Sequence, residues 1–121
     1  MKRRLAVFAA CLFATAAHAQ SLNDILSDLT TRMSHMNDEG EAAVASLHDG
    51  DLATACAHLA NRSAYAEQAG ADLDTMQATL DANTVMSDAA RADWQGHIID
   101  ARGSIAQIAD ANDSTRARYC A

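Results

Sequence analysis

The stretch SLNDILSDLTTRMSHMNDEGEAAVASLHDGD, residues 21–51, decides the fold. Apolar or small residues recur in it every seven positions, in a first column of Leu22, Leu29, Met36 and Ala43 and a second of Leu26, Met33, Gly40 and Leu47. Two columns offset by four residues form one seam of an α-helix. The pattern ends at HDGD, where Gly50 suits a left-handed helix terminus and Asp51 suits the N-cap of a second helix.

Two further segments repeat this pattern. In the second segment the column is Leu52, Leu59, Ala66, Leu73 and Leu80, flanked by Ala55, Cys56, Ala69 and Met76. Asn83 and Thr84 then predict a turn. After a cap at Thr84 or Ser87, a third helix is indicated by Trp94, Ala101 and Ile108 together with Ile98 and Ile105. The last residues, ANDSTRARYCA (111–121), are expected to form a looser tail.

The turns between these segments are short, which makes consecutive helices antiparallel neighbours. The sequence therefore predicts an all-α, up-down-up antiparallel three-helix bundle with a C-terminal tail. The absence of proline and the scarcity of aromatic residues agree with this fold class. Residues 20–121 are expected to form one helical-bundle domain. A helical hairpin that completes its core as a homodimer is the alternative, because a core this rich in alanine is thin.

The first nineteen residues, MKRRLAVFAACLFATAAHA, are typical of a cleaved secretory signal peptide. A basic start precedes an apolar run and an Ala17-His18-Ala19 site, so we expect cleavage after Ala19. A retained membrane anchor would need about 20 apolar residues. Lipoprotein processing at Cys11 would leave an apolar run of only a few residues. The expected destination is the periplasm or the external medium.

Removal of residues 1–19 would also remove three basic residues, leaving six arginines, no lysine and sixteen carboxylates. The remaining chain has a formal charge of −10. Such a chain repels phosphate backbones and anionic lipid, which argues against nucleic-acid binding and against membrane attachment after cleavage. Basic proteins, cationic peptides and metal cations are the partners that this charge favours.

Cys56 and Cys120 are the cysteines that follow the predicted signal peptide. In an up-down-up bundle, the start of the second helix and the end of the third lie at the same end. Export to an oxidising compartment favours a disulfide between two such cysteines. The sequence therefore predicts a Cys56–Cys120 bond that ties down the tail.

Three groups of residues are candidates for metal binding or acid–base chemistry. Met33, His35 and Met36, with Glu39, contain copper-like ligands, but helix geometry turns His35 away from the methionines. His48 and His58 lie near the HDGD turn with Asp49 and Asp51, and would suit zinc or copper. Asp93, His97 and Asp100 form one stripe beside Trp94, which also describes the polar edge of an amphipathic helix.

No local signature of a haem, zinc-protease, serine-hydrolase or phosphate-binding site is found in the sequence. The predicted function is that of an exported, non-enzymatic helical protein, without a cofactor, that binds a macromolecular or basic peptide partner through an acidic helical face. The alternative is a periplasmic protein that binds copper or zinc through His48 and His58.

Overall fold

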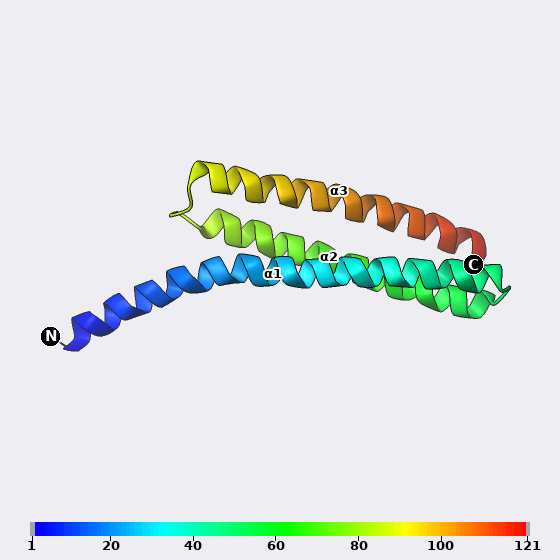
Figure 1. Cartoon of the computed structure of the whole chain (residues 1–121), viewed down its shortest axis with the longest axis horizontal. Coiled ribbons are helices and arrows are strands. Elements are labelled where there is room, and N and C mark those ends of the chain that lie inside the picture. Colours follow the sequence, from blue (N-terminus) through cyan, green and yellow to red (C-terminus); the bar gives the residue numbers. More distant parts are fainter. Residues whose placement is uncertain (1, 121) are drawn as a thin grey trace.

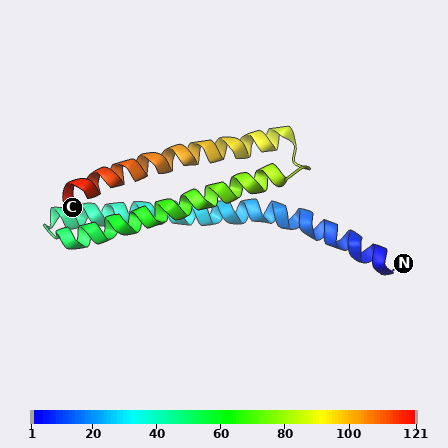
Figure 2. The ribbon, with the colours of Figure 1, turned by 180° about the vertical axis from the view of Figure 1, so that it is seen from behind.

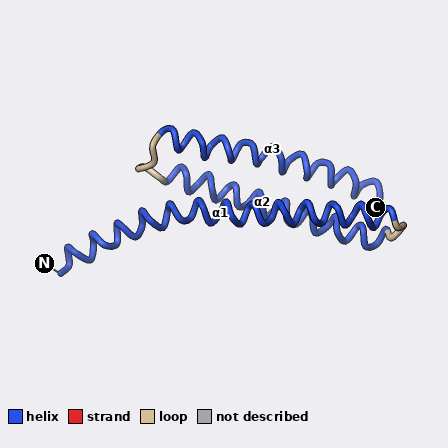
Figure 3. Tube along the Cα trace, in the orientation of Figure 1, coloured by secondary structure: helices blue, strands red, loops and turns tan. Residues whose placement is uncertain are grey.

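A computed structural model shows three α-helices joined by two short connections (Figures 1 and 3). It describes the backbone of residues 2–120 and the side chains of residues 22–120. The helices are α1 (Lys2–His48), α2 (Leu52–Ala82) and α3 (Asp88–Tyr119), and no strand occurs within residues 2–120. The prediction of an all-α chain with three helices is confirmed.

The second helix, α2, lies between α1 and α3. Cα atoms of α2 come within 8 Å of both α1 and α3, whereas α1 and α3 do not approach each other this closely in the described backbone. Figures 1 and 2 show α2 antiparallel to both neighbours. Ala43 of α1 and Ala55 and Ala69 of α2 are buried, and such small side chains allow two helices to pack closely.

The N-terminal part of α1 runs past the ends of the other two helices (Figure 1). The helix therefore begins earlier than the sequence pattern from Ser21 indicated. The prediction that residues 1–19 are a cleaved signal peptide falls outside the described side chains and stays a prediction.

Both connections are closed by residues with the expected local chemistry. Gly50 has a φ of 76°, a conformation that glycine adopts without steric cost. Ser87 is the N-cap of α3, where its Oγ accepts a hydrogen bond from the Ala90 N–H. In the second connection, the Asn83 side chain accepts hydrogen bonds from the N–H groups of Val85 and Met86. Asn83 and Ser87 thus define the second connection.

The predicted columns form the core. The first column of α1 is buried along its whole length, as are the α2 positions Leu59, Ala66, Leu73 and Leu80. Ile98 and Ile105 are their buried counterparts on α3. The second column of α1, the residues from Leu26 to Leu47, is half-buried at the edge of this core.

Leu52 is an exception, because the sequence pattern placed it in the buried column of α2. It is the first residue of α2 and is 47% exposed. A residue in the first turn of a helix has no preceding turn beside it, so neighbouring side chains cover it less. The prediction for Leu52 was wrong.

The predicted looser tail is also wrong, because residues 111–119 form the last turns of α3. Two features favour helix there. Arg116 and Arg118 lie in the last turn, where positive charge complements the helix dipole. Asn112 is buried and its Nδ2 donates to the Leu59 carbonyl oxygen (2.9 Å) and to Ser63 Oγ (2.6 Å).

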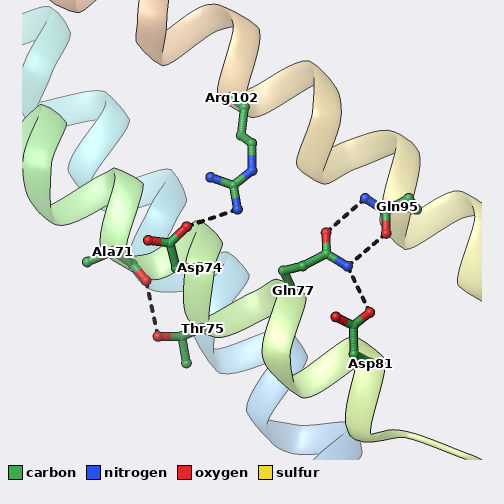
Figure 4. Close-up of polar contacts among 7 residues, drawn as sticks. All are labelled: Ala71, Asp74, Thr75, Gln77, Asp81, Gln95 and Arg102. Atoms are coloured by element: carbon green, nitrogen blue, oxygen red, sulfur yellow. Dashed lines mark hydrogen bonds and ion pairs between the residues drawn. The ribbon is translucent and has the colours of Figure 1, made fainter.

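Polar side chains join α2 to α3 on one side of the core (Figure 4). The amides of Gln77 and Gln95 exchange two hydrogen bonds of 2.9 and 2.8 Å. Arg102 reaches Asp74 across the same interface, with Nη2 3.0 Å from Oδ1. Arg91 donates from Nη1 to the Leu80 carbonyl oxygen (2.7 Å), which also accepts a hydrogen bond from the Asn83 backbone N–H at the end of α2 (3.2 Å).

Two adjacent isoleucines of α3 test this description of the core. Ile98 is 0% exposed and Ile99 is 60% exposed. We expect Ile98→Ala to lower the free energy of unfolding by about 2 to 5 kcal/mol, because it removes buried methyl groups and leaves a cavity. Ile99→Ala is the matched control and should stay within about 0.5 kcal/mol of the parent. Urea denaturation of residues 20–121 followed by circular dichroism measures both, and equal losses would contradict the assigned face of α3.

Candidate functional site

Two of the sequence-predicted groups, the cysteine pair and the His48–His58 group, lie at the end of the bundle that holds the α1–α2 turn. We call this end the turn pole and define it as residues 48–58 with 119–120. Cys56 lies in the second turn of α2, and Cys120 is the C-cap of α3. Their sulfur atoms are 2.13 Å apart and their Cα atoms 5.8 Å apart. The structure thus brings together the two cysteines that the sequence paired.

Asp51 begins α2 as its N-cap. Its carboxylate accepts from the Thr54 backbone N–H (3.1 Å) and from Thr54 Oγ1 (2.7 Å). These hydrogen bonds, the side-chain bond first, lower the pKa of Asp51 below the ordinary value for an aspartate. The carboxylate therefore caps the start of α2 and is ionised at neutral pH.

The two histidines of the proposed metal site have different surroundings. His48 is exposed in the last turn of α1. His58 is half-buried, and its Nδ1 lies 2.7 Å from Glu39 Oε2 of α1. Among the side chains of residues 22–120, no group of three or more His, Cys, Asp or Glu residues is placed to hold a metal ion. Glu39 is the partner of His58 that the sequence reasoning assigned to another group.

The methionine-rich segment of α1 divides between core and surface. Met36 is fully buried and Met33 is half-buried, as packing residues would be. His35 is exposed and stacks on Tyr65 of α2, with ring centroids 5.1 Å apart and an angle of 19° between the rings. The predicted divergence of His35 from Met36 is thus observed, whereas the partner Tyr65 had no signal in the sequence.

The third candidate group lies on α3 near the opposite end of the bundle. Asp93, His97 and Asp100 are exposed, and His97 meets the edge of Trp94 with ring centroids 6.4 Å apart. Asp93, Trp94 and His97 also line a shallow, open crevice with Asn23 and Leu26 of α1. The arrangement is a polar helix edge beside a partly covered tryptophan.

The arginines explain the charge of the surface. Two of them bind carboxylates across helix interfaces, Arg32 to Asp72 at 2.7 Å and Arg102 to Asp74 at 3.0 Å. Three others donate to neutral oxygens inside the fold, and Arg118 lies 5.3 Å from the ring centroid of Tyr119. The neutral acceptors are the Met36 carbonyl for Arg62, the Leu80 and Asn83 carbonyls for Arg91, and Ser63 Oγ for Arg116.

Most carboxylates consequently have no cationic partner among the described side chains. Asp72 and Asp74 form ion pairs with arginines there, and Glu39 contacts His58. Exposed carboxylates outside these pairs occur on all three helices: Asp24, Asp28, Asp38 and Glu41 on α1, Glu67 and Asp81 on α2, and Asp88, Asp93, Asp100, Asp110 and Asp113 on α3. Most arginines thus contact other groups of the fold, and the exposed surface is rich in carboxylates.

Comparison with known proteins adds no relative, since no protein-family model, curated protein or solved structure matches the chain. Within the described residues, none of the helices has an apolar stretch of the length needed to cross a membrane.

The N-cap gives a pH-dependent prediction. The folded-state pKa of Asp51 lies below its unfolded-state value, so its contribution to stability is present above the unfolded-state pKa and is lost as pH falls through the folded-state pKa. We expect Asp51→Ala to lower the Tm at neutral pH, and the difference from the parent to shrink as acid protonates the carboxylate. Asp49→Ala, an exposed neighbour outside the cap, is the control. A Tm difference that does not change with pH would contradict this role.

The cysteine pair gives a second prediction. We expect intact residues 20–121, purified from an oxidising compartment, to contain no thiol that alkylates before reduction and two that alkylate afterwards. Replacing both Cys56 and Cys120 by serine should lower the free energy of unfolding by about 2 to 5 kcal/mol, because the unfolded chain regains its loop entropy. Intact-mass spectrometry and urea denaturation measure these two effects, and two free thiols in the unreduced protein would exclude the bond.

Proposed function

We propose that this chain is an exported, non-enzymatic helical protein that binds a basic protein or basic peptide through an acidic helical face. The observation that carries the proposal is the use of the arginines. Five of the six arginines after residue 19 donate hydrogen bonds or ion pairs within the fold, while the exposed carboxylates outnumber the carboxylates in ion pairs.

The face that fits best lies on α1. Asp24, Asp28 and Asp38 are all exposed. At about 100° per residue they fall within one sector of about 80°. They therefore form one stripe along the outside of α1, which we call the α1 acidic stripe. Asp28 also lines a shallow groove with Arg32, His35 and Tyr65, so the stripe borders a surface with aromatic character.

The chemistry of this surface selects the partner. A formal charge of −10 on residues 20–121 disfavours acidic proteins and nucleic acids, and attracts Lys- and Arg-rich surfaces over distances of a Debye length. Exposed carboxylates mainly raise the association rate and the specificity of binding. Binding should therefore be strongest at low ionic strength and should weaken steeply with salt.

A pull-down with matched charge variants tests the proposal. The bait is oxidised residues 20–121 without a tag of strong charge, exposed to an extract of exported proteins at about 20 mM salt and then washed at about 300 mM. We expect basic proteins to be retained at the low salt and released at the high salt. Asp24→Asn, Asp28→Asn and Asp38→Asn together should weaken retention about tenfold, since three exposed ion pairs at about 0.5 kcal/mol each amount to that factor.

The control has the same net charge and differs only in position. Asp93→Asn, Asp100→Asn and Asp110→Asn remove three exposed carboxylates from α3. The control variant should retain the partner nearly as well as the parent. Equal losses in both variants would assign the retention to net charge alone, and retention that resists high salt in all three proteins would contradict an acidic-face contact.

A further inference from the structure

We propose that the Cys56–Cys120 pair is a redox-sensitive latch: the bond holds residues 106–119 of α3 against α2, and its reduction releases this segment while the rest of the bundle stays folded. The inference concerns a conformational device and does not depend on the partner proposed above. It rests on how unevenly α3 is packed along its length.

The first half of α3 is held by apolar burial. Ile98 and Ile105 belong to the main hydrophobic core with Leu73, Met76 and Leu80 of α2. Burial of such side chains contributes about 1.5 to 3 kcal/mol each. The reciprocal Gln77–Gln95 amide contact adds specificity on the same half of the helix. These contacts hold the first half of α3 on α2 without the disulfide.

The second half of α3 lacks that support. Beyond Ile105, no apolar side chain of α3 is fully buried among the described residues, and the one buried residue is Asn112. Ile108 is only partly buried. Since α1 does not approach α3 at the backbone level, α2 is the helix on which this segment packs. This segment therefore contributes no fully buried apolar side chain to its contact with α2.

Asn112 holds this segment on α2 less firmly than a buried apolar side chain would. Its Nδ2 donates two hydrogen bonds to α2, but its Oδ1 is buried without a hydrogen-bond partner. A buried polar atom without a partner costs about 1 to 3 kcal/mol, which offsets much of what the two hydrogen bonds contribute. Arg116 adds one side-chain contact, 3.2 Å from Nη1 to Ser63 Oγ. These contacts fix the register of the segment more than they stabilise it.

The disulfide acts where this packing is weakest. Cys120 follows the last helical residue, Tyr119, and helix ends open first in native proteins. A covalent bond from that position to the second turn of α2 prevents the last turns from leaving. Both cysteines are half-buried, so the thiolate of a reductant can reach the disulfide.

The reaction is thiol–disulfide exchange with a dithiol reductant. One reductant thiolate attacks a sulfur of the Cys56–Cys120 bond and forms a mixed disulfide, and the other cysteine leaves as a thiolate and is protonated. The second reductant thiolate resolves the mixed disulfide. Two electrons pass to the protein, which then carries two thiols, and the reductant becomes a disulfide. The released segment uncovers Leu59 and Ser63 of α2, which Asn112 contacts in the latched state.

Hydrogen exchange followed by mass spectrometry tests the latch on residues 20–121, oxidised and after reduction with a dithiol. In the reduced protein we expect amides of 106–119 to exchange within about tenfold of unprotected rates, while those of 73–80 and 95–105 stay protected by at least about a thousandfold. Reoxidation should restore the original pattern. Equal protection of both regions in the reduced protein would show a global stabiliser and overturn the latch, as would unchanged protection of 106–119.

Limited trypsin digestion gives an independent readout, because Arg116 and Arg118 lie in the latched segment and Arg91 lies outside it. In the variant with both Cys56→Ser and Cys120→Ser, cleavage after Arg116 and Arg118 should be at least about tenfold faster than in the oxidised parent. Cleavage after Arg91 should change much less and serves as the internal control. Equal acceleration at all three arginines would contradict local release.

Discussion

The burial of α2 on two sides is the constraint on which the rest of the structure depends. The residues from Leu59 to Leu80 that recur in it every seven positions are buried together with side chains from both α1 and α3. A helix that contacts two neighbours needs a wider apolar sector than a single heptad seam, and Ala69 and Met76 widen it. The antiparallel turn at Gly50 then fixes which α1 residues meet which α2 residues. The pairs Arg32–Asp72 and Glu39–His58 follow from that register, one heptad apart on α1.

Cationic side chains are scarce in this chain, and the fold uses them as interhelical connectors. Arg62 illustrates the point, because its guanidinium lies against Gly40, where a Cβ atom would come within 2.9 Å of its Cζ. The missing side chain at Gly40 lets Arg62 Nε reach the Met36 carbonyl oxygen at 3.1 Å. A glycine inside a helix costs about 1 kcal/mol relative to alanine, so this contact explains a residue that the local helix does not favour. The surface is acidic because the sixteen carboxylates after residue 19 outnumber the six arginines, most of which also contact other groups of the fold.

Periodicity predicted the three helices and most of the core, because each depends on residues close together in the sequence. The capping role of Asp51 and the positive φ at Gly50 also depend only on residues that are neighbours in the sequence, so they too could be predicted. The structure differed where the outcome depended on tertiary contacts. The exposure of Leu52 follows from its place at a helix start, and Asn112, within the helical residues 111–119, contacts Leu59 of α2, 53 residues away in the sequence. The His58–Glu39 contact required the exact register of two helices, which no single segment specifies.

A seven-residue count places Asn112 in the same column as Ile98 and Ile105. Continuing that column with an apolar residue would have extended the core toward the turn pole. The chain instead has a polar side chain at this position and two cysteines close to it in the fold, so a covalent bond replaces apolar burial at one end of α3. Apolar burial is permanent under native conditions, whereas a disulfide depends on the redox state of its surroundings. The middle of α3 and its C-terminal end are therefore held by different kinds of interaction, apolar burial and a covalent bond, which is the property that distinguishes this bundle from one with a continuous apolar seam.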